Sequence, residues 1–316
     1  MKHSRKFIIG IVSVLLLAII ILPVGCVSVP GGSGNKIAVI SLNGPITSGS
    51  GSLLSSTVIT PDVVRDQLHR AEEDAAVKAI VLRIDSPGGE VEPCQEISYD
   101  LAQVKQSIPV VVSMRSMAAS GGYYISADAD AIVALPSTLT GSIGVISQIP
   151  NLEGLYDKLG IQMQVFTGGE HKDMYSGLRE LTPEEKQIMQ DMTDEYYEQF
   201  ISVVAEGRGM SETEVKSLAT GQLYSGTDAK SLGLIDYLGG MDIALDVAAN
   251  LAGSENFTVE YYQPKSTSLL SLLLGINLKA LVNTVQMRLL GVSGEDILVL
   301  QALSTTYPQP QYLCSS

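Results

Sequence analysis

Apolar and polar positions follow two distinct periods along this chain. Short apolar runs typical of buried strands alternate with segments in which apolar residues recur every three or four positions, as on one face of a helix. The expected strands cover residues 36–42, 77–84, 109–114, 131–135, 143–147 and 258–262. The expected helices cover residues 60–73, 91–107, 119–127, 183–207 and 241–252. Strands that alternate with helices predict βαβ units and an α/β fold with a largely parallel core.

Two helix starts carry clear capping signals. Thr182 is followed by Pro183 and then by Glu185, the pattern of a capping box with proline at the first helical position. Ser211 and Glu214 repeat the same spacing, so a further short helix is expected there.

The first thirty residues differ in kind from the rest. Basic residues near the start precede an apolar run from Phe7 to Val24, and apolar residues continue to Val29. Eighteen residues of helix are about 27 Å long, which is close to the thickness of the hydrocarbon core of a bilayer. We therefore expect a cytoplasmic basic flank over residues 1–6 and an uncleaved single-pass anchor over residues 7–29.

The positive-inside rule then places the rest of the chain on the extracytoplasmic side of the cell membrane. Pro23 to Cys26 loosely resemble a lipoprotein cleavage site, so the sequence leaves open whether Cys26 is lipidated or the segment is cleaved.

Beyond the anchor, the pattern divides the chain into four parts. A Gly-rich linker is expected over residues 30–35, and one α/β domain over residues 36–262. An apolar, helical pattern occupies the C-terminal extension, residues 263–304. The end of the chain, residues 305–316, contains two prolines and is expected to be a loose tail.

Composition narrows the classes of function. The formal net charge is −14, from 34 acidic and 20 basic residues, which argues against a nucleic-acid partner. The 3 cysteines have no regular spacing, so neither a disulfide framework nor a zinc pattern is expected. No phosphate loop and no dinucleotide fingerprint is present, and we expect no cofactor and no metal.

The segment from Met117 to Tyr124 carries the most informative chemistry. It follows an apolar strand and places Ser120 between Ala119 and Gly121 at a strand-to-helix step. Small neighbours would let a substrate backbone approach, and amides at a helix start can stabilise an oxyanion. Taken alone, the segment is equally compatible with a nucleophile and with a small-residue packing step.

A second segment favours the nucleophile. The strand that ends at Asp85 is followed by Ser-Pro and by Gly88-Gly89, whose freedom at positive φ allows a turn with exposed amides. A glycine turn and a Gly-flanked serine, each at the end of an apolar strand, could together supply two oxyanion donors and a nucleophile.

Four ordered motifs resemble the signal peptide peptidases of the short, single-domain type, within the Clp protease/crotonase superfamily. The motifs are Asp85–Gly89, Ser116–Tyr124, Thr140–Val145 and Gly169–Asp173. The resemblance covers residues 36–252 and implies a fold of repeated ββα units with largely parallel sheets, with peripheral C-terminal helices added. The domain over residues 36–262 would then be a serine protease domain.

The resemblance also implies the roles of the site residues. Ser120 would be the nucleophile, and Lys172, about fifty residues later, the general base of a Ser-Lys dyad. Ser142 matches the serine that hydrogen-bonds this lysine. The amides of Gly89 and Gly121 would form the oxyanion hole, with Gly89 favoured over Gly88.

A lysine base is chemically coherent, although a histidine remains possible. A lysine amine is protonated at neutral pH, and burial among apolar groups favours the neutral form that can accept the hydroxyl proton. His171 is the only plausible histidine base, and it is the direct neighbour of Lys172.

By resemblance, the protein is expected to be a membrane-anchored serine endopeptidase that degrades released signal peptides. Members of this type assemble into homo-oligomeric rings, octamers by resemblance, in which adjacent protomers complete each dyad. Two alternatives remain: a stomatin-associated type of membrane protease that cleaves a membrane-protein partner, and a non-enzymatic ring scaffold. Acyl-CoA chemistry on a crotonase fold is disfavoured, because such enzymes need no nucleophilic serine.

Overall fold

The computed structural model describes residues 34–49, 58–254, 256–264 and the backbone of 311–313. The expected anchor and the apolar segment between residues 265 and 310 lie outside this part of the chain. Within the described residues, no helix combines the length and the apolarity needed to cross a membrane.

An eight-stranded sheet forms the centre of the domain, and its central order is β7-β6-β4-β2-β1-β9. Its strands are β1 (Asn35–Asn43), β2 (Val77–Ser86), β4 (Val110–Ala119), β5 (Ala131–Ala134), β6 (Leu139–Gly141), β7 (Leu223–Ser225), β8 (Tyr237–Leu238) and β9 (Phe257–Tyr262). All pairs are parallel except β6 with β7. The apolar runs that predicted the central strands are buried on both faces, as parallel sheets require.

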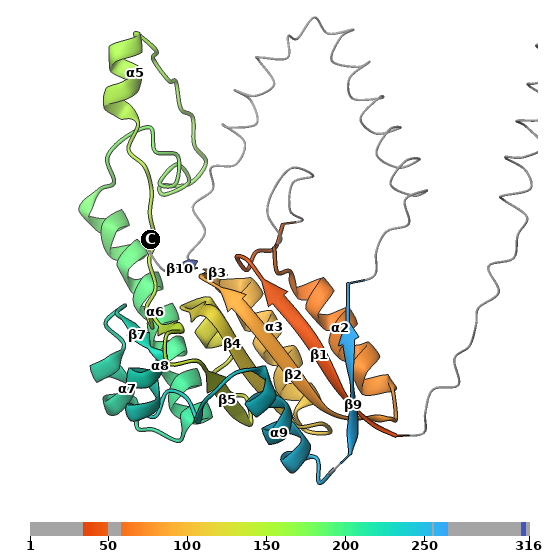
Figure 1. Ribbon diagram of the computed structural model, residues 1–316. Helices are drawn as coiled ribbons and strands as arrows, with labels where there is room; N and C mark the ends of the chain where they lie inside the picture. Colours follow the sequence, from red (N-terminus) through yellow and green to blue (C-terminus); the bar gives the residue numbers. More distant parts are fainter. Residues whose placement is uncertain (1–33, 50–57, 255, 265–310, 314–316) are drawn as a thin grey trace, which may run out of the picture. The chain divides into compact units, whose positions relative to one another are not determined.

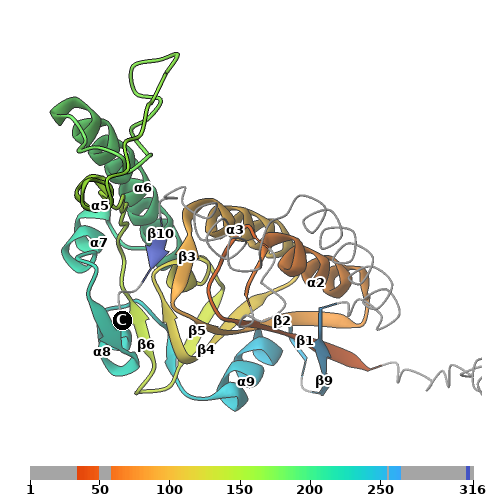
Figure 2. The same cartoon turned by 90° about the horizontal axis from the view of Figure 1, so that it is seen from above.

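Helices cover both faces of the sheet (Figures 1 and 2). The main apolar cluster joins one face to α2 (Pro61–Glu73), α3 (Val91–Val104), α4 (Gly121–Tyr124) and α6 (Pro183–Arg208). A smaller cluster joins the other face to α9 (Met241–Leu251). The expected α/β architecture with a largely parallel core is therefore confirmed.

Strand β4 changes partner along its length, and this change positions the site. Residues 111–114 pair with β5, whereas residues 117–119 pair with β6. The end of β4 therefore leaves β5, and Ala119 lies opposite Gly141 in the parallel ladder.

A second, two-stranded sheet lies beside this edge. It consists of β3 (Gly88–Glu90), which follows directly from the turn after β2, and β10 (Gln311–Leu313), in antiparallel register with Tyr312 opposite Gly89. Both views show the two strands side by side (Figures 1 and 2). A short strand thus forms within the segment 305–316 for which the sequence predicts a loose tail.

The remaining helices are α5 (Glu153–Leu159), α7 (Glu212–Leu218) and α8 (Gly226–Ser231). Helix α5 belongs to a segment between residues 148 and 180 that extends beyond the start of α6, away from the sheet (Figures 1 and 2). Large apolar side chains of this segment are exposed, including Leu155, Leu159, Met163 and Phe166.

Most of the expected elements form: five of the six expected strands are present, as β1, β2, β4, β5 and β9. The structure contains both expected capping boxes, at Thr182 and Ser211. The expected strand over residues 143–147 is wrong: β6 ends at Gly141 (φ 74°) and Ser142 (φ 50°), where positive φ breaks the extended backbone. The helix expected over residues 119–127 is a single short turn, α4.

Replacement of Phe200 tests how much the packing of α6 against α4 contributes to the stability of the fold. The Phe200 ring is fully buried and meets Tyr124 of α4 edge-to-face, with ring centroids 5.1 Å apart. Phe200→Ala is expected to lower the free energy of unfolding by about 3–5 kcal/mol, measured by urea denaturation. Phe166→Ala is the matched control: its ring is 91% exposed, so the change should stay within about 0.5 kcal/mol. Equal effects would contradict this account of the core.

Candidate active site

Ser120 sits in a strained and enclosed turn between β4 and α4. Its backbone has φ 51° and ψ −116°, a region that L-residues other than glycine rarely adopt. The turn is held by two backbone hydrogen bonds: Ser120 N–H donates to the Gly141 carbonyl (2.8 Å), and Tyr124 N–H donates to the Ser120 carbonyl (2.8 Å). The side chain is buried, and its hydroxyl has no hydrogen-bond partner among the described residues.

Ser142 occupies a matching position on the neighbouring strand. It follows Gly141 of β6 as Ser120 follows Ala119 of β4, and those two strand ends are paired. Ser142 is buried, and its N–H donates to the Gln222 carbonyl (2.8 Å). Within the described part of the chain, Ser120 and Ser142 are the non-glycine residues with positive φ. Two strained serines therefore end adjacent strands.

The two glycines expected at the oxyanion hole lie next to each other. A Cβ on Gly121 would stand 3.0 Å from the Gly89 nitrogen and 2.6 Å from the Cys94 sulfur. A Cβ on Gly89 would overlap the Ile46 carbonyl. Only glycine fits at either position, because neighbouring atoms lie too close to leave room for a Cβ atom.

The alternative donor, Gly88, is already engaged. Its N–H donates to the Ser86 hydroxyl (3.1 Å), whereas Gly88 O and Glu90 N–H both bond to Ile46. Peptide groups alternate along a strand, so the Gly89 N–H points to the side opposite Ile46. The Gly89 N–H therefore points to the side on which β10 pairs with β3, and this is the edge along which a substrate strand would pair.

Asp85 braces the end of β4. Its carboxylate accepts a hydrogen bond from Met117 N–H (3.2 Å), and it lies 3.6 Å from the Arg115 guanidinium. Thr140 Oγ1 donates to the Ala118 carbonyl (2.7 Å) from the other side. These bonds hold β4 between β2 and β6, so the position of Ser120 is fixed by neighbours on two strands.

A nearby cysteine does not compete as nucleophile. Cys94 lies on α3 beside Gly121, and its thiol is fully buried. Burial raises the pKa of the Cys94 thiol well above its ordinary value, and the thiolate is the form that attacks.

Lys172 is not joined to Ser120 within one chain. It lies in a turn between α5 and α6, and its side chain is exposed, while the Ser120 hydroxyl has no partner in the described residues. The structure thus brings together Ser120, Ser142, Gly89 and Gly121, and no hydrogen bond joins the predicted base, Lys172, to the Ser120 hydroxyl.

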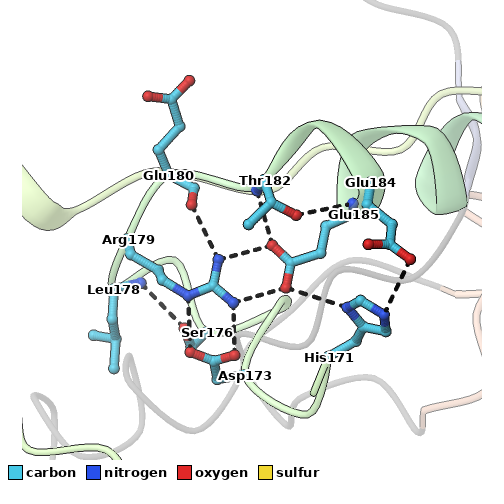
Figure 3. Close-up of polar contacts among 9 residues, drawn as sticks. All are labelled: His171, Asp173, Ser176, Leu178, Arg179, Glu180, Thr182, Glu184 and Glu185. Atoms are coloured by element: carbon cyan, nitrogen blue, oxygen red, sulfur yellow. Dashed lines mark hydrogen bonds and ion pairs between the residues drawn. The ribbon is translucent and has the colours of Figure 1, made fainter.

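His171 faces the beginning of α6 (Figure 3). Its Nδ1 lies 3.6 Å from Glu185 Oε1, and its Nε2 lies 3.9 Å from Glu184 Oε1. Glu170, His171 and Glu184 each offer one atom that could bind a metal ion, and these three atoms lie within 4.8 Å of one another. Both glutamates are exposed, and exposed acidic groups often gather in this way without an ion.

Sequence reasoning missed an ionic cluster around Arg179 (Figure 3). Its guanidinium pairs with Asp173 and with Glu185, the same glutamate that completes the capping box of α6. The capping box was visible in the sequence, but the loop that folds back onto its carboxylate was not.

The amino-acid sequence matches two protein families. The family model of Peptidase family S49 matches residues 102–255, and that of Clp protease matches residues 55–140. A protein of Enterococcus faecium assigned as signal peptide peptidase SppA is 38% identical over 247 residues, covering 78% of this chain and 72% of the relative. A protein of a Synechocystis species assigned as a protease is 42% identical over 225 residues, covering 71% of this chain and 77% of the relative.

The chain belongs to peptidase family S49, the family of signal peptide peptidases.

This S49 peptidase also matches one longer relative over less than half of that protein's length. Protease 4 of Salmonella typhi is 40% identical over 241 residues, which cover 76% of this chain and 38% of that protein. Among solved structures, a point mutant of the membrane-bound stomatin-specific protease 1510-N has a TM-score of 0.46 at 21% identity, covering 73% of this chain and 99% of the other. The expected enzyme class is confirmed: this is a serine peptidase of the signal peptide peptidase kind.

Replacing Ser120 with glycine should separate stability from activity. Ser120→Gly is expected to raise the free energy of unfolding by about 1 kcal/mol, because glycine tolerates positive φ and no buried hydroxyl is left unpaired. Peptidase activity should disappear. Ser120→Ala keeps the Cβ and its strain, so it should stabilise less.

The control is Ser113→Gly, a buried serine in the regular part of β4, which should lower stability. Stability is measured by denaturant unfolding of each variant. A Ser120→Gly protein less stable than Ser120→Ala would contradict the strain at this turn.

Proposed function

We propose that this S49 peptidase is a membrane-anchored endopeptidase that degrades released signal peptides through a Ser120–Lys172 dyad. The observation that carries the proposal is the Ser120 turn: a strained, buried hydroxyl without a partner in the described residues, beside the two crowded glycines, Gly89 and Gly121. Strain of this kind persists where the surrounding structure enforces it, and it is frequent at active sites.

The reaction follows acyl-enzyme chemistry. Ser120 Oγ attacks the peptide carbonyl carbon while its proton passes to the neutral amine of Lys172. Negative charge then develops on the carbonyl oxygen, where the Gly89 and Gly121 N–H groups donate hydrogen bonds. Lys172 returns the proton to the leaving amine as the C–N bond breaks. Water repeats the sequence on the ester and releases Ser120.

Lys172 reaches Ser120 from a neighbouring copy of the chain. Three observations support this step: Lys172 is exposed, the Ser120 hydroxyl is unpartnered in the described residues, and the segment that carries Lys172 presents exposed apolar side chains such as Leu159 and Phe166. Repeating this contact head-to-tail generates a closed ring if the rotation closes, in agreement with the octamer that the family resemblance implies. Ser142, one strand away from Ser120, would then receive the amine and orient it.

The substrate binds as an extended strand along β3. Support comes from β10, which already pairs with β3 in antiparallel register beside the expected oxyanion amide of Gly89. A peptide that adds to this edge gains affinity from main-chain bonds, and pockets for alternate side chains select among sequences. Apolar signal peptides fit this mode, and the net charge of −14 disfavours acidic ones.

The apolar run at residues 7–29 would anchor the enzyme in the cell membrane, with the domain on the extracytoplasmic side. Its length and its basic flank support this placement. The released signal peptides would then be met at the membrane where they remain.

The dyad is tested with single substitutions. Ser120→Ala and Lys172→Ala should each abolish cleavage of a fluorogenic signal-peptide substrate, because nucleophile and base act as one unit. His171→Ala should keep most of the activity. An inactive His171→Ala protein alongside an active Lys172→Ala protein would replace the lysine with a histidine base.

Mixed assemblies test where the base comes from. Ser120→Ala and Lys172→Ala chains, each inactive alone, are unfolded together, refolded and assayed. Random mixing places an intact Ser120 against an intact Lys172 at roughly one interface in four, so activity should return. If the dyad forms within one chain, no mixture can regain it.

Truncation tests the peptide edge. Removal of residues 311–316 frees β3 from β10, so KM for a peptide substrate should fall while kcat stays nearly unchanged. Removal of residues 314–316 alone leaves β10 in place and is the matched control. Equal KM values for the two truncated proteins would contradict substrate binding along β3.

A further inference from the structure

The residues on either side of Lys172 lie close to one buried carboxylate, and one of them is bonded to it through an arginine. His171 Nδ1 lies 3.6 Å from Glu185 Oε1, and Asp173 is bridged to the same glutamate through Arg179. The Asp173 side of the turn that contains Lys172 is thereby hydrogen-bonded to the first turn of α6 through Arg179 (Figure 3), and His171 lies against the same glutamate. The lysine side chain itself stays exposed. The backbone that carries the lysine is held, and the amine is free to reach outward.

The Arg179 guanidinium uses every donor it has in this link. It has five N–H groups, and five hydrogen bonds engage them. Nε and Nη2 donate to Asp173 (2.9 and 2.7 Å), Nη1 and Nη2 donate to Glu185 (2.7 Å each), and Nη1 also donates to the Glu180 carbonyl (3.1 Å). A lysine ammonium has three donors and no planar fork, so it cannot reproduce the pattern.

Glu185 is the point at which loop and helix meet. The side chain is 2% exposed, and its Oε2 also accepts a hydrogen bond from Thr182 N–H (2.9 Å). Its own N–H in turn donates to Thr182 Oγ1 (3.2 Å), which closes the capping box. Helix α6 packs through Phe200 into the main core. Its first turn is therefore a fixed point to which the loop can bind.

The two carboxylates of the link stay charged at neutral and alkaline pH. Hydrogen bonds from Arg179 lower the pKa of Asp173 below its ordinary value, and together with Thr182 N–H they lower the pKa of Glu185 to about 2. A carboxylate with a lowered pKa keeps its stabilising contacts above its unfolded value and loses them as pH falls through the folded one. The link is therefore lost only in strong acid, and proton transfer at Lys172 leaves it intact.

We infer that Arg179 is a positioning residue that sets the location of Lys172 by clamping Asp173 to Glu185. The inference rests on the proposed role of Lys172 as general base. Without the guanidinium, Asp173 and the buried Glu185 face each other as unpaired like charges, and the loop leaves the start of α6. Misplacement of a catalytic group by about 1 Å can slow a reaction by roughly 100-fold.

The test compares the same substitution at the two ends of α6. Arg179→Lys should lower kcat by roughly 100-fold while KM changes by less than about twofold, because the peptide edge at β3 is untouched. Arg208→Lys is the matched control: Arg208 also forms an ion pair, with Asp236 (2.6 Å), and is nearly buried, but it lies at the far end of the helix. This control should lose stability and keep kcat close to that of the parent protein.

Lys172→Ala, assayed in parallel, separates the two claims. An active Lys172→Ala protein would contradict the proposed function itself, because Lys172 would then not be the general base. An inactive Lys172→Ala protein, with Arg179→Lys no slower than Arg208→Lys at equal folded fraction, overturns the positioning role and leaves the dyad standing. Folded fractions are taken from thermal unfolding curves, with assays well below the transitions. If Arg179→Lys fails to fold, Asp173→Asn, which removes one half of the clamp, replaces it under the same criteria.

A mixing experiment then places the effect in the copy that supplies the lysine. Ser120→Ala/Arg179→Lys chains mixed with Lys172→Ala chains should be slow, whereas Ser120→Ala chains mixed with Lys172→Ala/Arg179→Lys chains should regain normal activity. A merely structural role of Arg179 predicts equal losses in both mixtures, and that result would overturn the inference. If the mixture of Ser120→Ala and Lys172→Ala chains that keep Arg179 is also inactive, the dyad lies within one chain. The comparison of kcat between Arg179→Lys and Arg208→Lys then decides whether Arg179 has a positioning role.

Discussion

The candidate site depends on how closely two backbones approach at Gly89 and Gly121. Neither position accommodates a Cβ: one would overlap the Ile46 carbonyl, and the other would press on the Gly89 nitrogen and the Cys94 sulfur. This contact places the first residue of α4 against the turn after β2, and Ser120 is carried into the gap between them. The positive φ of Ser120 is the conformational cost of that approach, and it is held by bonds to neighbouring strands rather than by the serine side chain.

The strands at this edge have different tasks. β2 supplies the glycine turn and the Asp85 brace, β4 supplies the serine, and β6 receives the Ser120 N–H through Gly141. Because β4 exchanges β5 for β6 partway along, its end can bend toward the turn while its beginning stays in the regular core. Catalytic geometry is thus produced by a local change of partner within an otherwise regular parallel sheet.

Local signals in the sequence predicted much of this arrangement. Apolar runs located β1, β2, β5 and β9, and capping residues located α6 and α7, because burial and orphan amides act over a few neighbours. The run over residues 143–147 was misread as a strand, since the pattern cannot show that Gly141 and Ser142 take positive φ. The local side-chain links of Arg179 to Asp173 and Glu185 leave no periodic trace in the sequence, and neither does the distant pairing of β10 with β3. Under the proposed mechanism, the contact of Lys172 with Ser120 requires more than one chain.

The hydrogen bond from Ser142 N–H to the Gln222 carbonyl has a consequence for the order in which the enzyme matures. The serine turn is assembled from segments near residues 86–90, 117–121, 140–142 and 222–224, so its contacts span more than a hundred positions of sequence. Pairing over such separations forms late, after the intervening chain has been ordered. The bond at Ser142 therefore requires the segment around Gln222, so a chain that ends before this residue lacks one of the contacts that hold the site.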